Sequence, residues 1–135
     1  MTGVTPQQLD RILHVVEHAL DMHEKWRASL LRTLVCGLGL PDSIHATDAH
    51  RHCDFGRWLY SRPNEELRHT PAFQTIEALH RRMHDCTREA CLKSRALGRM
   101  TEEDYDDMNA AMSRFEAELK AYQDKVRITV QQMAS

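Results

Sequence analysis

The spacing of apolar residues is the feature of this sequence that most restricts its fold. Three long segments, over about residues 6–35, 71–97 and 102–133, place an apolar side chain every three or four positions. This is the period at which one face of an α-helix meets a core. No segment shows the alternation of apolar and polar residues that is typical of a strand. We therefore predict an all-α bundle of three long helices and at least one short helix, over about residues 50–60.

Local signals mark the ends of these helices. Thr5 and Thr70 each precede a proline, and Thr101 precedes three acidic residues, so all three threonines are suited to the start of a helix. Two glycines and a proline follow the first segment after about Val35, and Gly98 follows the second. The last segment has no such stop before Ser135. We therefore predict one domain, residues 1–135, whose last helix continues into another, C-terminal domain, the alternative being a helix that simply ends there.

Composition and charge exclude several classes of protein. The 135 residues suit one domain, and a net charge of −2 argues against a nucleic-acid partner. The apolar runs are too short to span a membrane, and the N-terminus lacks the apolar core of a signal peptide. We therefore expect a cytoplasmic protein. None of its four cysteines forms a CxxC pair, and a disulfide framework is not expected in that compartment.

Two histidines share one face of the second long helix. His80 and His84 are four residues apart, so both imidazoles can reach one metal ion. The spacing alone is weak support, because two solvated histidines would give the same pattern. His80, however, lies on the apolar stripe, where burial of an imidazole is unfavourable unless its nitrogens find partners. A metal ion would satisfy one nitrogen of each ring.

A third histidine and a cysteine complete a candidate ligand set. His23 fills the stripe position between Leu20 and Trp26, although a single histidine there is more simply a hydrogen-bonded core residue. Cys53 could likewise be a small buried apolar residue, but Gly56 lies one turn away and allows close approach of the backbone. Three imidazoles and one thiolate suit tetrahedral Zn²⁺ and disfavour magnesium and calcium.

Other ligand sets remain open at this point. Cys91 could share a face with His84, and two histidines beside Cys53 could compete with it. We interpret three cysteines as packing residues: Cys36, Cys86 and Cys91. We interpret four histidines as mostly solvated: His45, His50, His52 and His69. Four carboxylates could accept hydrogen bonds from the ligand imidazoles: Asp21, Glu24, Glu77 and Asp85.

The residues singled out above carry a resemblance to a known family. His23 with Trp26, "CDFGRWLY" at 53–60 and "HRRMH" at 80–84 resemble the pattern of the chemoreceptor zinc-binding (CZB) domain, over about residues 9–133. The resemblance implies a four-helix bundle with an additional short helix carrying the CxxGxW segment. It also implies Zn²⁺ held by four residues and a sensory role in the cytoplasm. The implied ligands are His23, Cys53, His80 and His84.

The resemblance also implies partners and a signal. CZB domains are attached to chemoreceptors and, at the N-terminus, to diguanylate cyclases of the GGDEF type, and this chain resembles the cyclase-linked form. GGDEF domains work in pairs, so we expect a homodimer, the alternative being a monomer whose apolar seam is wholly internal. The implied inputs are zinc and oxidants such as hypochlorous acid, which attack a zinc-bound thiolate. The implied output is control of a diguanylate cyclase making cyclic di-GMP, with zinc inhibitory.

Four protein ligands leave no open metal position, so we expect no enzymatic activity in this chain. No HExxH, P-loop or nucleophile elbow is present in the sequence. Three alternatives remain. The first is the sensor domain of a chemoreceptor. The second is a hemerythrin-like di-iron bundle, for which "HVVEH" at 14–18 is a partial match that gives Cys53 no role. The third is a metal-free dimerisation bundle.

Overall fold

The computed structural model describes residues 5–36 and 46–134, and within them it contains helices and no strand. The prediction of an all-α protein is therefore confirmed. The long helices are α1 (Pro6–Cys36), α5 (Pro71–Leu97) and α6 (Glu102–Ala134). The short ones are α2 (Ala49–His52), α3 (Asp54–Leu59), a 3₁₀ turn (Arg62–Asn64) and α4 (Glu65–Arg68).

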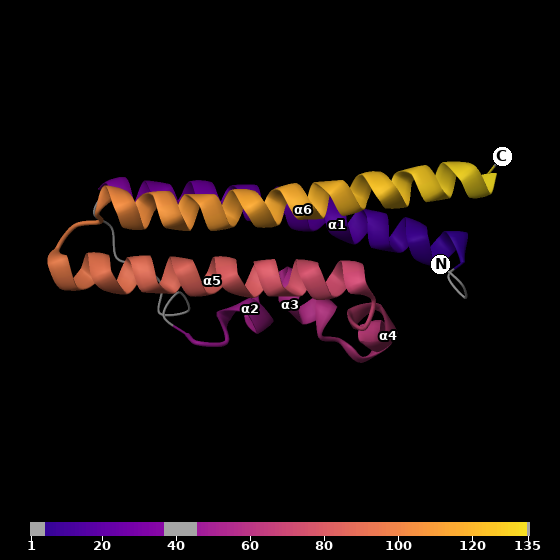
Figure 1. Cartoon of the computed structure of the whole chain (residues 1–135), viewed down its shortest axis with the longest axis horizontal. Coiled ribbons are helices and arrows are strands. Elements are labelled where there is room, and N and C mark those ends of the chain that lie inside the picture. The colour runs from indigo at the N-terminus through magenta and orange to yellow at the C-terminus, as the bar shows by residue number, and fades with distance from the viewer. Residues whose placement is uncertain (1–4, 37–45, 135) are drawn as a thin grey trace.

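The long helices form three sides of the bundle (Figure 1). Helix α6 packs against both α1 and α5. Helix α3 contacts α1, while α2 and α4 pack against α5, so the fourth side is formed by the short helices. This arrangement places α1, α3 and α5 around one part of the core. None of the helices in the described ranges is both long enough and apolar enough to cross a membrane.

The predicted threonines precede the helix starts and the predicted glycine ends α5, largely as expected. Thr5 forms a reciprocal cap, because Gln8 N–H donates to Thr5 Oγ1 (3.1 Å) and Thr5 N–H donates to Gln8 Oε1 (2.8 Å). Thr101 Oγ1 accepts from Asp104 N–H (3.2 Å) at the start of α6. Thr70 precedes α5 but its hydroxyl donates backward to Leu67 O (2.7 Å). Gly98 ends α5 with φ +76°, a left-handed conformation that favours glycine.

The core follows the predicted stripes but ends before the helices do. On α6 the buried positions are Met108, Ala111, Met112, Phe115, Leu119, Tyr122 and Val126. Three positions of the expected stripes are instead exposed, namely Leu97 (63%), Tyr105 (38%) and Met133 (46%). They lie near helix ends, where fewer neighbouring helices remain to cover them.

The predicted short helix over residues 50–60 is in fact two helices. They are separated at Cys53, whose ψ of 161° is extended. The Cys53 Sγ accepts the N–H of Gly56 (3.3 Å), so the thiol caps the start of α3. The break therefore fixes the direction of the cysteine side chain.

Candidate metal centre

Three of the four predicted ligands converge in the core. His23 of α1, Cys53 between α2 and α3, and His80 of α5 present ligand atoms that all lie within 4.8 Å of one another. The Sγ of Cys53 is 3.3 Å from Nε2 of His80. Ligand atoms around a tetrahedral zinc ion with these donors lie roughly 3.3–3.8 Å apart. The thiol and one imidazole therefore already have the spacing of a zinc site.

His84 lies at the edge of this cluster. Its ring centroid is 4.7 Å from that of His80 and 6.3 Å from that of His23. Its ligand atoms fall outside the group in which every pair is within 4.8 Å. The structure thus brings three predicted ligands together and places the fourth beside them.

The buried ring nitrogens test whether a metal fits here. Nδ1 of His23 and Nε2 of His84 are buried and have no hydrogen-bond partner among the described residues. Such unpaired buried polar atoms are unfavourable and uncommon. A metal ion bound to the imidazoles would use lone pairs that the protein leaves unpaired, so the residues fit a zinc ion.

Aromatic side chains form the walls of the site. The Phe115 ring of α6 lies 4.8 Å from the ring of His23 and 5.0 Å from that of His80. Phe55 of α3 lies 5.0 Å from His80, and Trp26 of α1 lies 5.3 Å from His84. These walls exclude water from the imidazoles.

Burial sets the protonation states in the metal-free protein. It lowers the pKa of His23 to about 4 and that of His84 to about 3. The pKa of His80 is also well below its usual value, through burial and the neighbouring histidines. Burial raises the pKa of Cys53, although the Gly56 N–H opposes this. At neutral pH the imidazoles are therefore ready to bind a metal, which has only the thiol proton to displace.

His50 corrects one prediction. It was expected to be solvated, but it is 5% exposed, and its Nδ1 has no partner among the described residues. Its ring lies 6.1 Å from that of Tyr60. Beside it, Gly56 lets α3 approach the His50 backbone so closely that a Cβ at position 56 would clash with it. In the sequence, Gly56 three residues after Cys53 indicated a close approach of two backbone segments. It did not indicate that the partner would be His50.

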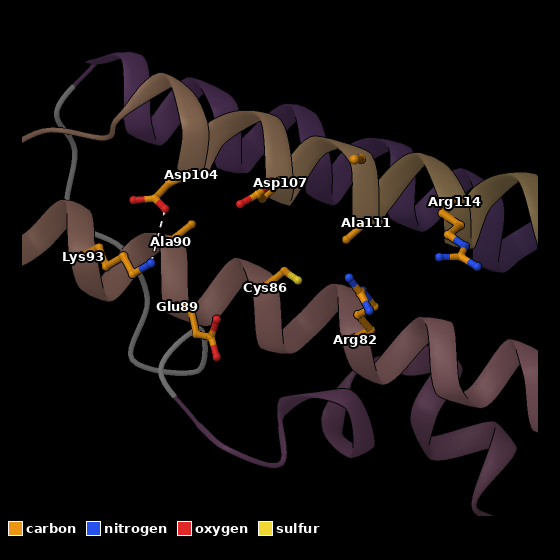
Figure 2. Close-up of a pocket in the computed structure, with 10 residues that line it drawn as sticks. Arg82, Cys86, Glu89, Ala90, Lys93, Asp104, Asp107, Ala111 and Arg114 are labelled. Atoms are coloured by element: carbon orange, nitrogen blue, oxygen red, sulfur yellow. Dashed lines mark hydrogen bonds and ion pairs between the residues drawn. The ribbon is translucent and has the colours of Figure 1, made fainter.

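The remaining histidines and cysteines divide more simply. His52 and His69 are exposed as predicted, and His45 lies outside the described residues. Cys91 is buried as predicted, whereas Cys36 is exposed at the end of α1, where its packing partners end. Cys86 is half-buried and points into a groove between α5 and α6 (Figure 2).

The expected carboxylate acceptors bond elsewhere. Asp21 pairs with Lys25 (3.0 Å), and Asp85 pairs with Arg88 (3.1 Å). Glu24 is exposed. The di-iron alternative loses its partial motif as well, because the His14 side chain is 72% exposed and Glu17 pairs with Arg127.

The segment that carries Cys53 is anchored to α5 independently of any metal. The Tyr60 hydroxyl donates to Glu77 Oε1 (2.7 Å), and the Arg51 guanidinium lies 4.5 Å above the Tyr60 ring. Leu59, on the same short helix as Phe55, is completely buried. These contacts position the thiol before zinc arrives.

We expect Tyr60→Phe to destabilise the domain by about 1–2 kcal/mol, because it leaves a half-buried carboxylate without its donor. Urea unfolding of the metal-free protein measures this change. Tyr105→Phe, which alters an exposed tyrosine on α6, is the matched control and should change little. Equal effects of the two substitutions would show that the Tyr60–Glu77 bond does not anchor the segment.

Comparison with known families identifies the class of protein. The family model of the chemoreceptor zinc-binding domain matches residues 23–91, just over half of the chain and a range that includes all four predicted ligands. The chain therefore belongs to the CZB family. The family is a zinc-binding one, which agrees with the donor set of His23, Cys53 and His80.

Two matches concern one particular relative. Diguanylate cyclase DgcZ from Escherichia coli (strain K12) is 31% identical over 88 residues, which are 63% of this chain and 29% of DgcZ. A solved structure of the regulatory CZB domain of DgcZ matches with a TM-score of 0.70 at 26% identity. That match covers 87% of this chain and 98% of the solved domain. The chain thus spans less than a third of DgcZ and matches the part of DgcZ that is described as a regulatory domain, in agreement with the expectation that it is not an enzyme.

Proposed function

We propose that this chain is a zinc-responsive regulatory domain in which one Zn²⁺ is held by His23, Cys53, His80 and His84. The observation that carries the proposal is the buried convergence of a thiol and two imidazoles, with Sγ and Nε2 3.3 Å apart. His84 supports it, because its ring lies 4.7 Å from that of His80 and its buried Nε2 has no partner among the described residues. Four protein ligands would leave no coordination position open for water or substrate. The ion would therefore be regulatory and would not catalyse hydrolysis.

The proposed output is an attached signalling domain. The match to DgcZ, whose name describes a diguanylate cyclase, supports a GGDEF domain that makes cyclic di-GMP, following α6. The alternative is a chemoreceptor, which the family's own description favours. Activity of the full-length protein with and without zinc distinguishes the two, since only a cyclase would produce cyclic di-GMP.

The thiolate offers a second proposed input. Zinc keeps Cys53 deprotonated, and a zinc-bound thiolate remains nucleophilic, so an oxidant such as hypochlorous acid could convert it to a sulfenic acid. Loss of that ligand would weaken zinc binding. All four cysteines are free thiols, which is compatible with the proposed cytoplasmic location.

A homodimer is part of the proposal. Two large apolar side chains near the end of α6, Ile128 (54%) and Met133 (46%), are exposed beyond the last buried position of that helix. A second copy could cover them. Sedimentation of the purified domain tests this, and a monomer at micromolar concentration would contradict it.

Metal analysis is the direct test of the site. We expect about one zinc per chain, no iron, and at least ~100-fold weaker zinc binding in Cys53→Ala and His80→Ala. His52→Ala is the matched control. His52 lies next to Cys53 in the sequence, but its side chain is exposed and pairs with Asp48. Free zinc at 1,000 times Kd should stabilise the wild-type fold by about 4 kcal/mol. A chelator that changes neither metal content nor the melting temperature would contradict the proposal and favour a metal-free bundle.

A further inference from the structure

Helix α6 supplies none of the proposed ligands, although it passes directly beside the site. Its contact with the cluster is the Phe115 ring, which packs against His23 and His80. The ligands come from α1, α5 and the segment between them. A change in metal occupancy therefore needs a route to α6 that does not pass through a metal bond.

Arg27 provides such a route. It lies on α1 four residues after His23, so the two side chains are one helical turn apart. Its Nη1 donates to both carboxylate oxygens of Glu116 on α6, at 3.2 and 3.1 Å. Its Nη2 donates to Asn109 and, at 3.3 Å, to Ser113. One side chain thus holds three side chains spread over two turns of α6.

This contact differs from the other ion pairs between long helices. The Arg27 and Glu116 side chains are only 21% and 23% exposed, so solvent screens their pairing less than usual. Arg127–Glu17, which also joins α6 to α1, is exposed at 47% and 44%. Between α5 and α6, in the described part of the chain, Lys93 pairs with Asp104 at 3.4 Å, and the lysine side chain is 62% exposed.

A groove also separates parts of α5 and α6. This groove, of about 300 Å³, lies between the two helices, with Arg82 and Cys86 on α5 and Arg114 on α6 (Figure 2). Although α6 contacts α5 more extensively than α1, the ion pair with Arg27 of α1 is the one between long helices, among the described residues, in which neither side chain is more than a quarter exposed. Helices joined in this way can shift as a pair by an ångström or two relative to a third helix.

We propose that Arg27 is the coupling residue that makes α6 follow the metal-ligating face of α1. The inference rests on the proposed zinc site. The ligand atoms of His23, His80 and Cys53 lie within 4.8 Å of one another, and binding one zinc ion would require them to reach tetrahedral spacing. Arg27 carries that displacement to Glu116, Ser113 and Asn109, and the groove between α5 and α6 leaves room for it. Arg27 itself is a positioning residue and binds no metal.

Hydrogen exchange of the 135-residue chain with and without zinc tests the coupling. In the wild type, zinc should slow exchange in peptides covering α6 from residue 109 onward. Arg27→Ala should still bind one zinc per chain and yet lose this zinc-dependent difference on α6. Arg127→Ala, which breaks the exposed α1–α6 pair, is the matched control and should keep the difference. A purely structural role for Arg27 would raise exchange equally with and without zinc and would leave the difference intact.

A second variant keeps the test decisive if Arg27→Ala does not fold. Glu116→Gln preserves side-chain volume and one hydrogen-bond acceptor, and it should reduce the zinc-dependent difference while leaving the helices folded. A full zinc response on α6 in Arg27→Ala, or in Glu116→Gln where Arg27→Ala does not fold, overturns the inference. An equal loss in Arg127→Ala also overturns it. Absence of zinc binding in the wild type overturns the proposed function, and this inference with it.

Discussion

Gly56→Ala should destabilise the domain by about 3 kcal/mol, near the upper end for an overpacked site. A Cβ at this position would lie 1.9 Å from the carbonyl oxygen of His50 and 2.9 Å from its carbonyl carbon. The Cα of Arg51 would be 3.0 Å away. All three are backbone atoms, so no side-chain rotation relieves the clash, and α2 and α3 must separate.

The same substitution should weaken zinc binding at least ~100-fold, because the separated helices carry Cys53 away from His80. Urea unfolding and zinc titration of one preparation measure both effects. Gly98→Ala is the matched control: its φ of +76° makes alanine unfavourable by about 1–2 kcal/mol, while the space around it is open. Gly98→Ala should therefore lose stability without losing zinc affinity. Unaltered zinc binding in Gly56→Ala would show that the close approach does not position the thiol.

Helical periodicity predicted the fold because burial follows the same period. His23 and His80 were recognised as inward-facing because each occupies a stripe position, and both are buried. The order of the long helices and the end of α5 at Gly98 followed from equally local signals. For these features, sequence neighbours alone determine which face of a helix meets the core.

The features that escaped prediction depend on residues far apart in the chain or on detailed backbone geometry. His50 lies in a short segment with no stripe, and in the fold α3 packs on its backbone while the Tyr60 ring lies beside its own ring. The break at Cys53 arises because its sulfur accepts the Gly56 N–H. The Arg27 contacts join residues 82 to 89 positions apart, and ordinary polar residues on two helices give no local sign that they will meet.

The candidate metal centre depends both on local periodicity and on contacts between distant residues. Periodicity placed the imidazoles in the core, but the position of the thiol depends on the tertiary contact at Gly56. Knowledge of the ligand types was therefore sufficient to suggest zinc, whereas the distance between Cys53 and His80 required the structure. The same division applies to function, because the candidate ligands were visible in the sequence and the Arg27 contacts between α1 and α6 were not.

Acid should destabilise the metal-free domain from about pH 6.5 downward. The pKa of His23 falls from 6.5 to about 4 on folding, and that of His84 from 6.5 to about 3, both through burial. Because the unfolded chain binds these protons more readily, stability is complete above pH 6.5 and falls as the pH drops toward 4 and 3. At pH 5 each histidine accounts for a loss of about 2 kcal/mol. His80, whose pKa is lowered in the same direction, adds to this loss.

Urea unfolding in the presence of a chelator at pH 7.5, 6 and 5 measures the effect. We expect a loss of at least about 4 kcal/mol between the first and last pH, a large part of the stability of a typical domain. His84→Gln removes one of the buried imidazoles and should reduce the loss at pH 5 by about 2 kcal/mol. If the loss in this variant equals that of the wild type, the acid sensitivity arises elsewhere. Such a result would mean that His84 is not held as a buried neutral imidazole, the state in which its lone pair is free for zinc.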